Sequence, residues 1–179
     1  MARLIACLLA ACATMSAAAE PPAWQIDYGA SQIAFEAEQA GAAFRGAFRG
    51  FEADVRFDPA DLAESHARVR VQTASVATED DERDGILRGA GWFESDAFPD
   101  AVFEASSFAA TPAGFRATGT LTIRTVTVPV AFDFTLTDDG LRGSAVLDRI
   151  ALGLGLGEWA DATWIGHRVE VDVVLVRVR

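Results

Sequence analysis

Cysteine is nearly absent from this chain of 179 residues, in which only Cys7 and Cys12 occur, both close to the amino terminus. The rest of the sequence therefore offers no disulfide, no cysteine nucleophile and no cysteine ligand for a metal. Lysine does not occur at all, and the only histidines, His66 and His167, have no ligand-spaced partner in the sequence. A zinc site and a cysteine- or histidine-dependent enzyme are disfavoured by these absences.

Positive charge and long hydrophobic runs are also scarce. The 15 arginines face 26 acidic residues, which gives a formal net charge of −11. Such a surface repels the phosphates of nucleic acids, so we expect no nucleic acid partner. Beyond the first 19 residues, no apolar run approaches the roughly 18 residues of a membrane-spanning helix. We therefore do not expect an integral membrane protein.

The amino terminus has the pattern of an export signal. A single charge at Arg3 precedes an apolar run, Leu4–Ala13, and the small residues Ala17–Ala19. We predict a signal peptide at residues 1–19 and a periplasmic mature domain at residues 20–179, whose net charge becomes −12 with the loss of Arg3. An alternative is lipoprotein anchoring through Cys12, which follows Leu9-Ala10-Ala11 as in a lipobox. We prefer plain cleavage, because the lipobox reading leaves an unusually short apolar core.

Alternating apolar residues are the most abundant pattern in the chain. They occupy every second position from Phe115 to Ile123 and again, with reversed parity, from Val126 to Phe134. This reversal predicts a two-residue hairpin that pairs Ile123 with Val126. A second hairpin is predicted at Asp139-Gly140, where it would pair Phe134 with Ala145 and point Arg149 inward near a rim.

The rest of the sequence adds further strands and a single helix. Strands are expected at residues 31–38, 67–72, 102–107 and 167–179, and a long one at 43–58 with a bulge at Gly46 and Gly50. The charged stretch after Thr78 predicts one short helix near residues 79–93, with Thr78 and Asp81 as a capping box. About eight strands and one helix indicate an all-β fold, with a sandwich or a closed antiparallel barrel as the two options.

Two other motifs resemble functional sites and fail on spacing. Residues 80–85 begin like a calcium-binding loop, but Gly91 stands where the closing glutamate belongs. The glycines at 153, 155 and 157 lack the spacing of a dinucleotide-binding loop, and a flexible connection between strands explains them better. The titratable candidates for a catalytic site are Arg83, Asp84, Arg149 and the two histidines, with no nucleophile among them. We therefore predict no catalytic residue.

The order of several short motifs resembles the YceI-like family over nearly all of the mature chain. The resemblance rests on Trp24-x-Ile26-Asp27, Ser31-x-Ile33-x-Phe35, Gly46-x-Phe48-x-x-Phe51, Val55-x-Phe57-Asp58, Ser75-Val76-x-Thr78, Arg83-Asp84-x-x-Leu87, Trp92-Phe93, Phe98-Pro99-x-x-x-Phe103, Gly119-x-Leu121-Thr122 and Val126-Thr127. Two positions depart from the family pattern, since Thr125 replaces a usual glycine and Leu152 a usual aromatic residue. These departures concern turn geometry and the pocket more than the fold.

The resemblance implies a lipocalin-like, eight-stranded antiparallel barrel in the bacterial periplasm, whose apolar tunnel holds a polyisoprenoid lipid such as an isoprenoid quinone or its precursor. No covalent cofactor and no metal is expected. The predicted ligand-binding residues are Phe35, Phe48, Phe103, Phe115, Phe132, Phe134, Ala145, Leu147 and Arg149. We expect Arg149 to contact the head group, and Arg83 with Asp84 to form a structural ion pair.

Two further interpretations stay open beside a lipid carrier. The protein could be a non-catalytic accessory module of a membrane b-type cytochrome, with a filled barrel and no stored ligand, because some family members are encoded beside such a cytochrome. A homodimer is also compatible with the sequence. A packed interior would favour the accessory module, whereas an apolar cavity would favour the carrier.

Overall fold

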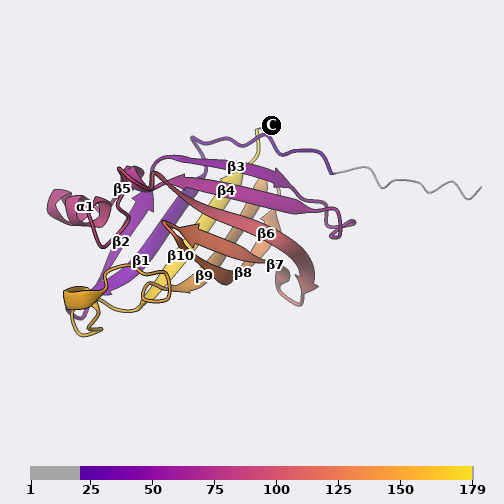
Figure 1. Cartoon of the computed structure of the whole chain (residues 1–179). Helices are drawn as coiled ribbons and strands as arrows, with labels where there is room; N and C mark the ends of the chain where they lie inside the picture. The colour runs from indigo at the N-terminus through magenta and orange to yellow at the C-terminus, as the bar shows by residue number, and fades with distance from the viewer. Residues whose placement is uncertain (1–20, 179) are drawn as a thin grey trace, which may run out of the picture.

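The computed structural model describes residues 21–178, so the predicted signal peptide and Cys12 lie outside the described residues. Ten antiparallel strands form one strongly curled sheet (Figure 1). They are β1 (Gln32–Gln39), β2 (Ala42–Phe48), β3 (Phe51–Arg56), β4 (His66–Gln72), β5 (Val76–Ala77), β6 (Asp100–Thr111), β7 (Gly114–Ile123), β8 (Val126–Thr137), β9 (Gly140–Asp148) and β10 (Arg168–Val176). The helix α1 (Asp81–Arg88) and two short 3₁₀ turns, η1 (Thr73–Ser75) and η2 (Gly157–Trp159), complete the fold. The prediction of an all-β, lipocalin-like fold with one helical insertion is confirmed.

The sheet curls so far that one bent segment of the chain, β2 followed by β3, supplies strands near both edges of the sheet. The strand order is β3-β4-β6-β7-β8-β9-β10-β1-β2-β5, and only Arg49 and Gly50 separate β2 from β3. The expected strand at residues 43–58 is therefore broken rather than bulged, because its halves must pair with β1 on one side and β4 on the other. Counting this bent segment once and leaving out the two-residue β5 returns the predicted eight strands. Pairing through Gly46 is regular, so no bulge lies there.

The register of the β7–β8 hairpin agrees with the prediction, with Ile123 opposite Val126. The β8–β9 register is shifted by two residues, so that Phe134 lies opposite Gly143 instead of Ala145. The reason lies in a third strand. A Cβ atom at Gly140 would collide with the backbone carbonyl of Leu175 in β10, so Gly140 belongs in the ladder and Asp138-Asp139 forms the turn. A shift of two residues preserves parity, so the same β9 side chains still face inward.

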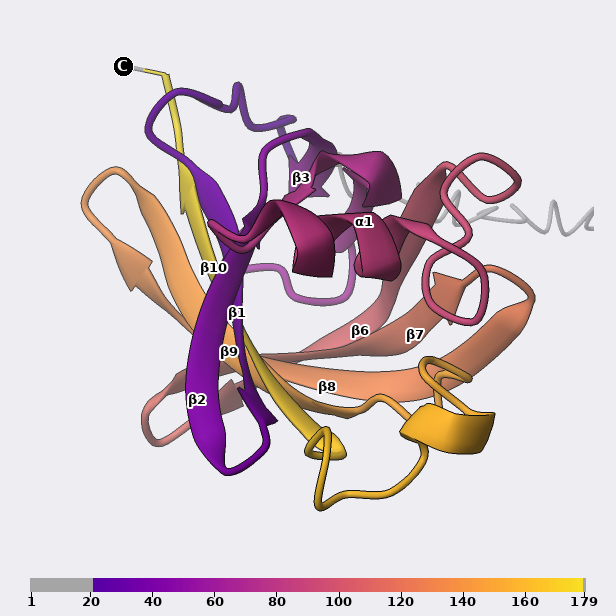
Figure 2. The same ribbon diagram turned by 90° about the vertical axis from the view of Figure 1, so that its left-hand side faces the viewer.

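Helix α1 lies across one end of the curled sheet (Figure 2). Its N-cap is Asp80 rather than Thr78, since an Asp80 carboxylate oxygen accepts a hydrogen bond of 3.0 Å from the backbone N–H of Arg83. The prediction of Thr78 in a capping box is therefore wrong. Thr78 instead donates its backbone N–H and its hydroxyl to the buried carboxylate of Asp84, at 2.8 and 2.7 Å. These two bonds attach the helix to the segment that follows β5.

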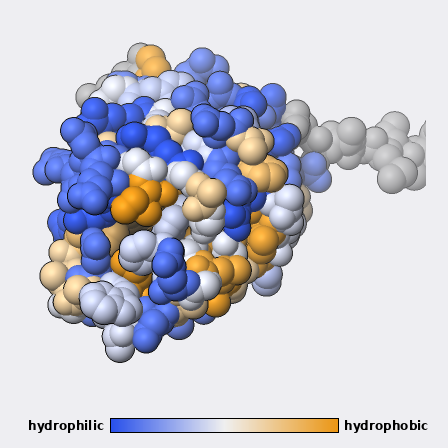
Figure 3. Space-filling model, turned by 60° about the vertical axis from the view of Figure 1, so that its left-hand side comes forward, coloured by the Kyte–Doolittle hydropathy of each residue, from blue (hydrophilic) through white to orange (hydrophobic). Residues whose placement is uncertain are grey.

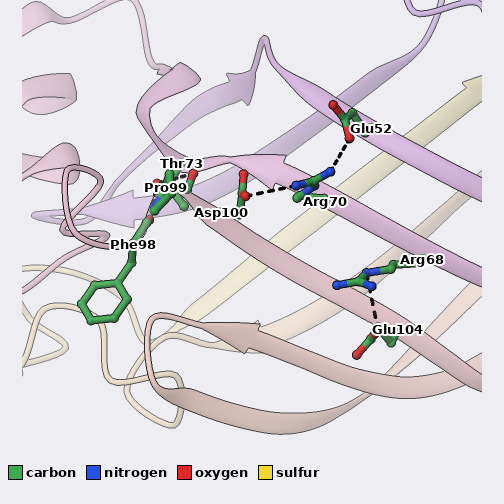
Figure 4. Close-up of polar contacts among 8 residues, drawn as sticks. All are labelled: Glu52, Arg68, Arg70, Thr73, Phe98, Pro99, Asp100 and Glu104. Atoms are coloured by element: carbon green, nitrogen blue, oxygen red, sulfur yellow. Dashed lines mark hydrogen bonds and ion pairs between the residues drawn. The ribbon is translucent and has the colours of Figure 1, made fainter.

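The opposite edge of the sheet is held by contacts among β3, β4 and β6 (Figure 4). Glu52 and Asp100 flank Arg70 at 2.7 and 3.6 Å on the exposed face, where such pairs contribute at most about 1 kcal/mol. The buried hydroxyl of Thr73 donates to the carbonyls of Phe98 and Pro99, at 2.9 and 3.0 Å. Thr73 thereby fixes the end of β4 against the start of β6.

Two groups of buried side chains divide the interior. One group lies under α1 and includes Phe35, Trp92 and Leu152, while the other lies at the far end and includes Phe57, Phe134 and Leu175. Many inward-facing strand residues between them, Val171 among them, are only half-buried. A solid core would bury them fully, so the interior between the two groups is not filled. Within residues 21–178, no helix is long and apolar enough to span a membrane.

Candidate functional site

A cavity of about 430 Å³ opens beside α1. Strand residues such as Phe35, Phe48 and Val169 form its walls, and the segment from Arg149 to Ile165 covers one side. Its exposed lining residues are Gln39, Asp80, Glu82 and Ile86, which together with the half-buried Arg83 define what we call the mouth. Figure 3 shows hydrophobic side chains gathered around a hollow on this side of the molecule, with hydrophilic residues around them.

A second cavity of about 140 Å³ lies deeper in the barrel. Every residue that lines it is apolar. Five residues line both cavities and therefore lie between them, and we call them the neck: Ile33, Val71, Leu121, Leu147 and Val171. The two cavities together form an apolar space with two chambers along the barrel.

Aromatic rings pack against one another at the end of β3 and the start of β7, which lie at the end of the barrel opposite α1 (Figure 1). Phe57 contacts Phe108, Phe115 and Phe134 with ring centroids 5.1–5.3 Å apart, mostly edge to face. These four residues form a phenylalanine plug. Phe115 stacks behind Phe134 at 5.6 Å and lines neither cavity, so the prediction that it lines the tunnel is wrong. The sequence shows that Phe115 points inward but not that the chamber ends before it.

The other predicted wall residues lie along the two chambers. Phe35, Phe48 and Leu147 line the outer chamber, whereas Phe103, Phe132, Phe134, Ala145 and again Leu147 line the inner one. Phe35 depends on a glycine across the β1–β2 pair, because a Cβ atom at Gly46 would collide with its ring. Arg116, Thr118 and Thr120 face the solvent as predicted.

Arg149 lies beside the outer chamber but is not a free rim residue. It is 2% exposed, and all five of its N–H groups donate to backbone carbonyls, those of Leu154, Gly155, Trp159, Ile165 and Gly166, at 2.6–3.0 Å. Burial lowers the pKa of this guanidinium below its usual value, and the nearby Asp148 opposes the shift. The prediction that Arg149 serves the head group therefore does not fit, because no donor is left for it.

The glycine-rich loop therefore has a defined conformation and is not the flexible connection that we predicted. Gly153 and Gly155 have φ angles of +73° and +61°, and a Cβ atom at Gly155 would meet Trp92 and Arg149. This backbone turns its carbonyls towards one guanidinium. The alternation of residues in the strand predicts that Arg149 points inward. The spacing of the glycines does not predict that Arg149 binds the backbone carbonyls of this loop.

The roles of Arg83 and Asp84 also differ from the prediction. Asp84 is buried and lies 3.5 Å from Arg88, while Arg83 forms its ion pair with Asp80 at 3.4 Å, so no Arg83–Asp84 pair forms. Arg83 lines the mouth and packs its guanidinium over the ring of Phe44 at 4.4 Å. Arg83 is thus the arginine that faces the opening.

Several lining residues come from α1 and from connecting segments, which strand patterns do not predict. They are Leu87, Trp92, Phe93, Leu152, Leu154, Trp159 and Ile165. The adjacent aromatic pair after the helix and the apolar residues alternating with glycines were the available signals. Within the described part of the chain, neither cavity is lined by a serine, threonine, tyrosine, cysteine or histidine.

Comparison with known proteins agrees with this architecture. The UPF0312 protein from Yersinia pestis (strain Pestoides F) is 35% identical over 95 residues, and the one from Photorhabdus laumondii is 32% identical over the same length. These matches cover 53% of this chain and 50% of each relative, so the chain spans about half the length of the curated relatives it matches.

Solved structures share the fold over a larger part of the chain. BcnA of Burkholderia cenocepacia superposes with a TM-score of 0.80 and 29% identity, covering 86% of this chain and all of BcnA. A polyisoprenoid binding domain from Saccharophagus degradans superposes with a TM-score of 0.62 and 18% identity, covering 85% and 95%. The sequence model of the YceI-like domain matches residues 24–176. This match spans most of the sequence, and the chain therefore belongs to the YceI-like family.

Proposed function

We propose that this protein binds one polyisoprenoid lipid, an isoprenoid quinone or its precursor, with the tail in the two chambers and the head group at the mouth. The observation that supports the proposal most directly is the apolar space divided by the neck. Its outer chamber of about 430 Å³ falls within the range of about 300–1,000 Å³ that is typical of ligand sites. A slender chain fits a tube with a constriction, whereas a wide ring system does not pass one.

The lining also favours binding over catalysis. Charged groups lie only beside the outer chamber, at Asp80, Glu82, Arg83 and Arg149, and Arg149 has no free donor. Acyl or phosphoryl transfer needs a nucleophile or base near the substrate. The lining side chains provide no serine, cysteine or histidine, and their two carboxylates, Asp80 and Glu82, are exposed at the mouth. The likeness to the polyisoprenoid binding domain from Saccharophagus degradans supports the same class of ligand. We infer a carrier or storage protein without catalytic activity.

The proposal places this carrier in the periplasm, where a prenyl lipid must cross water between membranes. An isoprenoid chain is insoluble in water, and each buried CH₂ group gains about 0.8 kcal/mol on leaving it. The predicted signal peptide supports this location. Sequencing of the mature protein from the native host should find Glu20 as its first residue, and a diacylated Cys12 would overturn that expectation.

The decisive test is mass spectrometry of organic extracts from protein purified without detergent. A stoichiometric prenyl lipid in the extract is the expected result, and added prenyl quinone should quench the fluorescence of Trp92 and Trp159, which line the outer chamber. An empty extract together with no binding of any prenyl compound would refute the carrier. That result would favour an accessory module of a membrane b-type cytochrome, or a homodimer with no stored ligand.

A further inference from the structure

The charged and amide side chains that line the outer chamber are few, and they are not equivalent. They are Gln39, Asp80, Glu82, Arg83 and Arg149. With its tail in the chambers, a prenyl lipid places its head group at the mouth among the first four, because Arg149 is buried with every donor occupied. Trp92 also lines the outer chamber, but its indole N–H is a buried donor away from the exposed residues of the mouth. The properties of the head group are therefore decided at the mouth.

Arg83 is held in place there but keeps donors for a ligand. Its Nε donates to the side-chain oxygen of Gln39 at 3.1 Å, and one Nη2 hydrogen goes to Asp80 at 3.4 Å. Its guanidinium packs on Phe44, and its side chain is 25% exposed. Among residues 21–178, Nη1 donates no hydrogen bond, so this nitrogen retains both of its donors.

The charges around Arg83 limit which head group suits these donors. Two exposed carboxylates, Asp80 and Glu82, accompany this single guanidinium at the mouth. Asp81 adds a third carboxylate to the same helical turn. A diphosphate would bring further negative charge against these groups, whereas a carbonyl or phenol oxygen needs only a donor. The mouth therefore suits an uncharged hydrogen-bond acceptor.

We propose that Arg83, positioned by Gln39 and Asp80, donates a hydrogen bond to an uncharged oxygen of the ligand's ring head group, and that the mouth discriminates against prenyl diphosphates. The inference rests on the proposed function, because it assigns the head-group end of the same site. It makes Arg83 the specificity-determining residue of the protein. The ligand class narrows to prenylated quinones and phenols.

The test compares three ligands of similar tail length: a prenylated benzoquinone, a prenyl diphosphate and a headless prenyl hydrocarbon. Arg83→Met should weaken quinone binding about 10- to 100-fold, the range expected for one lost hydrogen bond to a charged donor, and leave hydrocarbon binding unchanged. Arg45→Met is the matched control, since Arg45 pairs with Glu36 on the exposed side of the neighbouring hairpin and lines neither cavity. Glu82→Gln should improve diphosphate binding with little effect on the quinone.

The outcomes separate the inference from the proposed function. Equal weakening of quinone and hydrocarbon by Arg83→Met would overturn the role of Arg83 and leave the carrier intact, as would wild-type protein that binds diphosphate as well as quinone. Failure of wild-type protein to bind any of the three ligands would refute the carrier itself. If Arg83→Met does not fold, Gln39→Leu provides the same comparison from outside the helix. It removes the bond to Nε, and a smaller loss for the quinone alone is expected.

Discussion

Filling the inner chamber tests the two-chambered cavity most directly. Ala145 on β9 lines this chamber, whose 140 Å³ is about a quarter of the combined volume of the two cavities. In Ala145→Trp the indole would occupy this space. A filled core would pay about 1–3 kcal/mol for such an insertion, so we expect a loss of unfolding free energy at or below the lower end of that range.

The effect on binding should depend on tail length. At about 0.3 kcal/mol for each non-hydrogen atom, one five-carbon isoprene unit is worth about 1.5 kcal/mol, or roughly tenfold in Kd. In wild-type protein, each unit that passes the neck should therefore improve affinity about tenfold. In Ala145→Trp the improvement should stop at the length that fills the outer chamber, and shorter prenyl alcohols should bind as before.

Equilibrium dialysis against radiolabelled prenyl alcohols of increasing length measures this directly, without relying on tryptophan fluorescence. Ala131→Trp is the matched control, because Ala131 lies on the exposed face of the neighbouring β8. Parallel length dependence in wild type and Ala145→Trp would refute the use of the inner chamber. A loss of more than about 3 kcal/mol of unfolding free energy would show that the interior around Ala145 is solid.

Three further predictions concern residues that hold the site together. Arg149→Met should lower the unfolding free energy by about 3–5 kcal/mol in urea titrations, because it leaves several buried carbonyls without a donor; a loss below 1 kcal/mol would contradict this role. Gly46→Ala should lower it by about 1–3 kcal/mol by displacing Phe35, while Gly85→Ala in α1, where a Cβ atom meets nothing, should raise it by about 0.5–1 kcal/mol. Hydrogen bonds from the backbone N–H and hydroxyl of Thr163 lower the pKa of Asp161, so its contribution is complete above the ordinary aspartate pKa of about 3.9 and is lost as the pH falls through the lower folded-state value. Wild type should therefore lose more stability than Asp161→Asn on acidification through this range, and identical acid profiles would refute the assignment.

Local pairing is the part of the fold that the sequence predicts best. The change of apolar parity between Ile123 and Val126 is enough to predict the register of the β7–β8 hairpin, because a two-residue turn and one buried face determine that register. The β8–β9 register could not be obtained in the same way. It depends on the close approach of Gly140 to the backbone of Leu175, a contact with a strand that lies 35 residues later in the chain.

In the candidate site, too, the sequence predicts what depends on local pattern and misses what depends on distant contacts. Strand parity identifies wall residues such as Phe35 and Leu147, since a side chain's face follows from its position in the strand. It cannot identify the end of the chamber, so it misplaces Phe115. The sequence assigns the head-group role to the wrong arginine for a similar reason. The role of Arg149 is decided by carbonyls of an irregular loop, and the role of Arg83 by where a helix lies on the barrel. Neither role can be predicted from the alternation of residues along a strand or helix.

The two chambers differ in polarity, and this difference determines which way round a bound lipid lies. A head group cannot enter the inner chamber without losing its hydrogen bonds, because every side chain there is apolar. In the proposed carrier, a lipid held tail-inward would leave head first, and its terminal isoprene units would be the last to lose contact with protein. An acceptor would then take the lipid from the side of α1. Transfer would be fastest when the mouth rests against the acceptor, since the tail then slides from one apolar phase into another without crossing water.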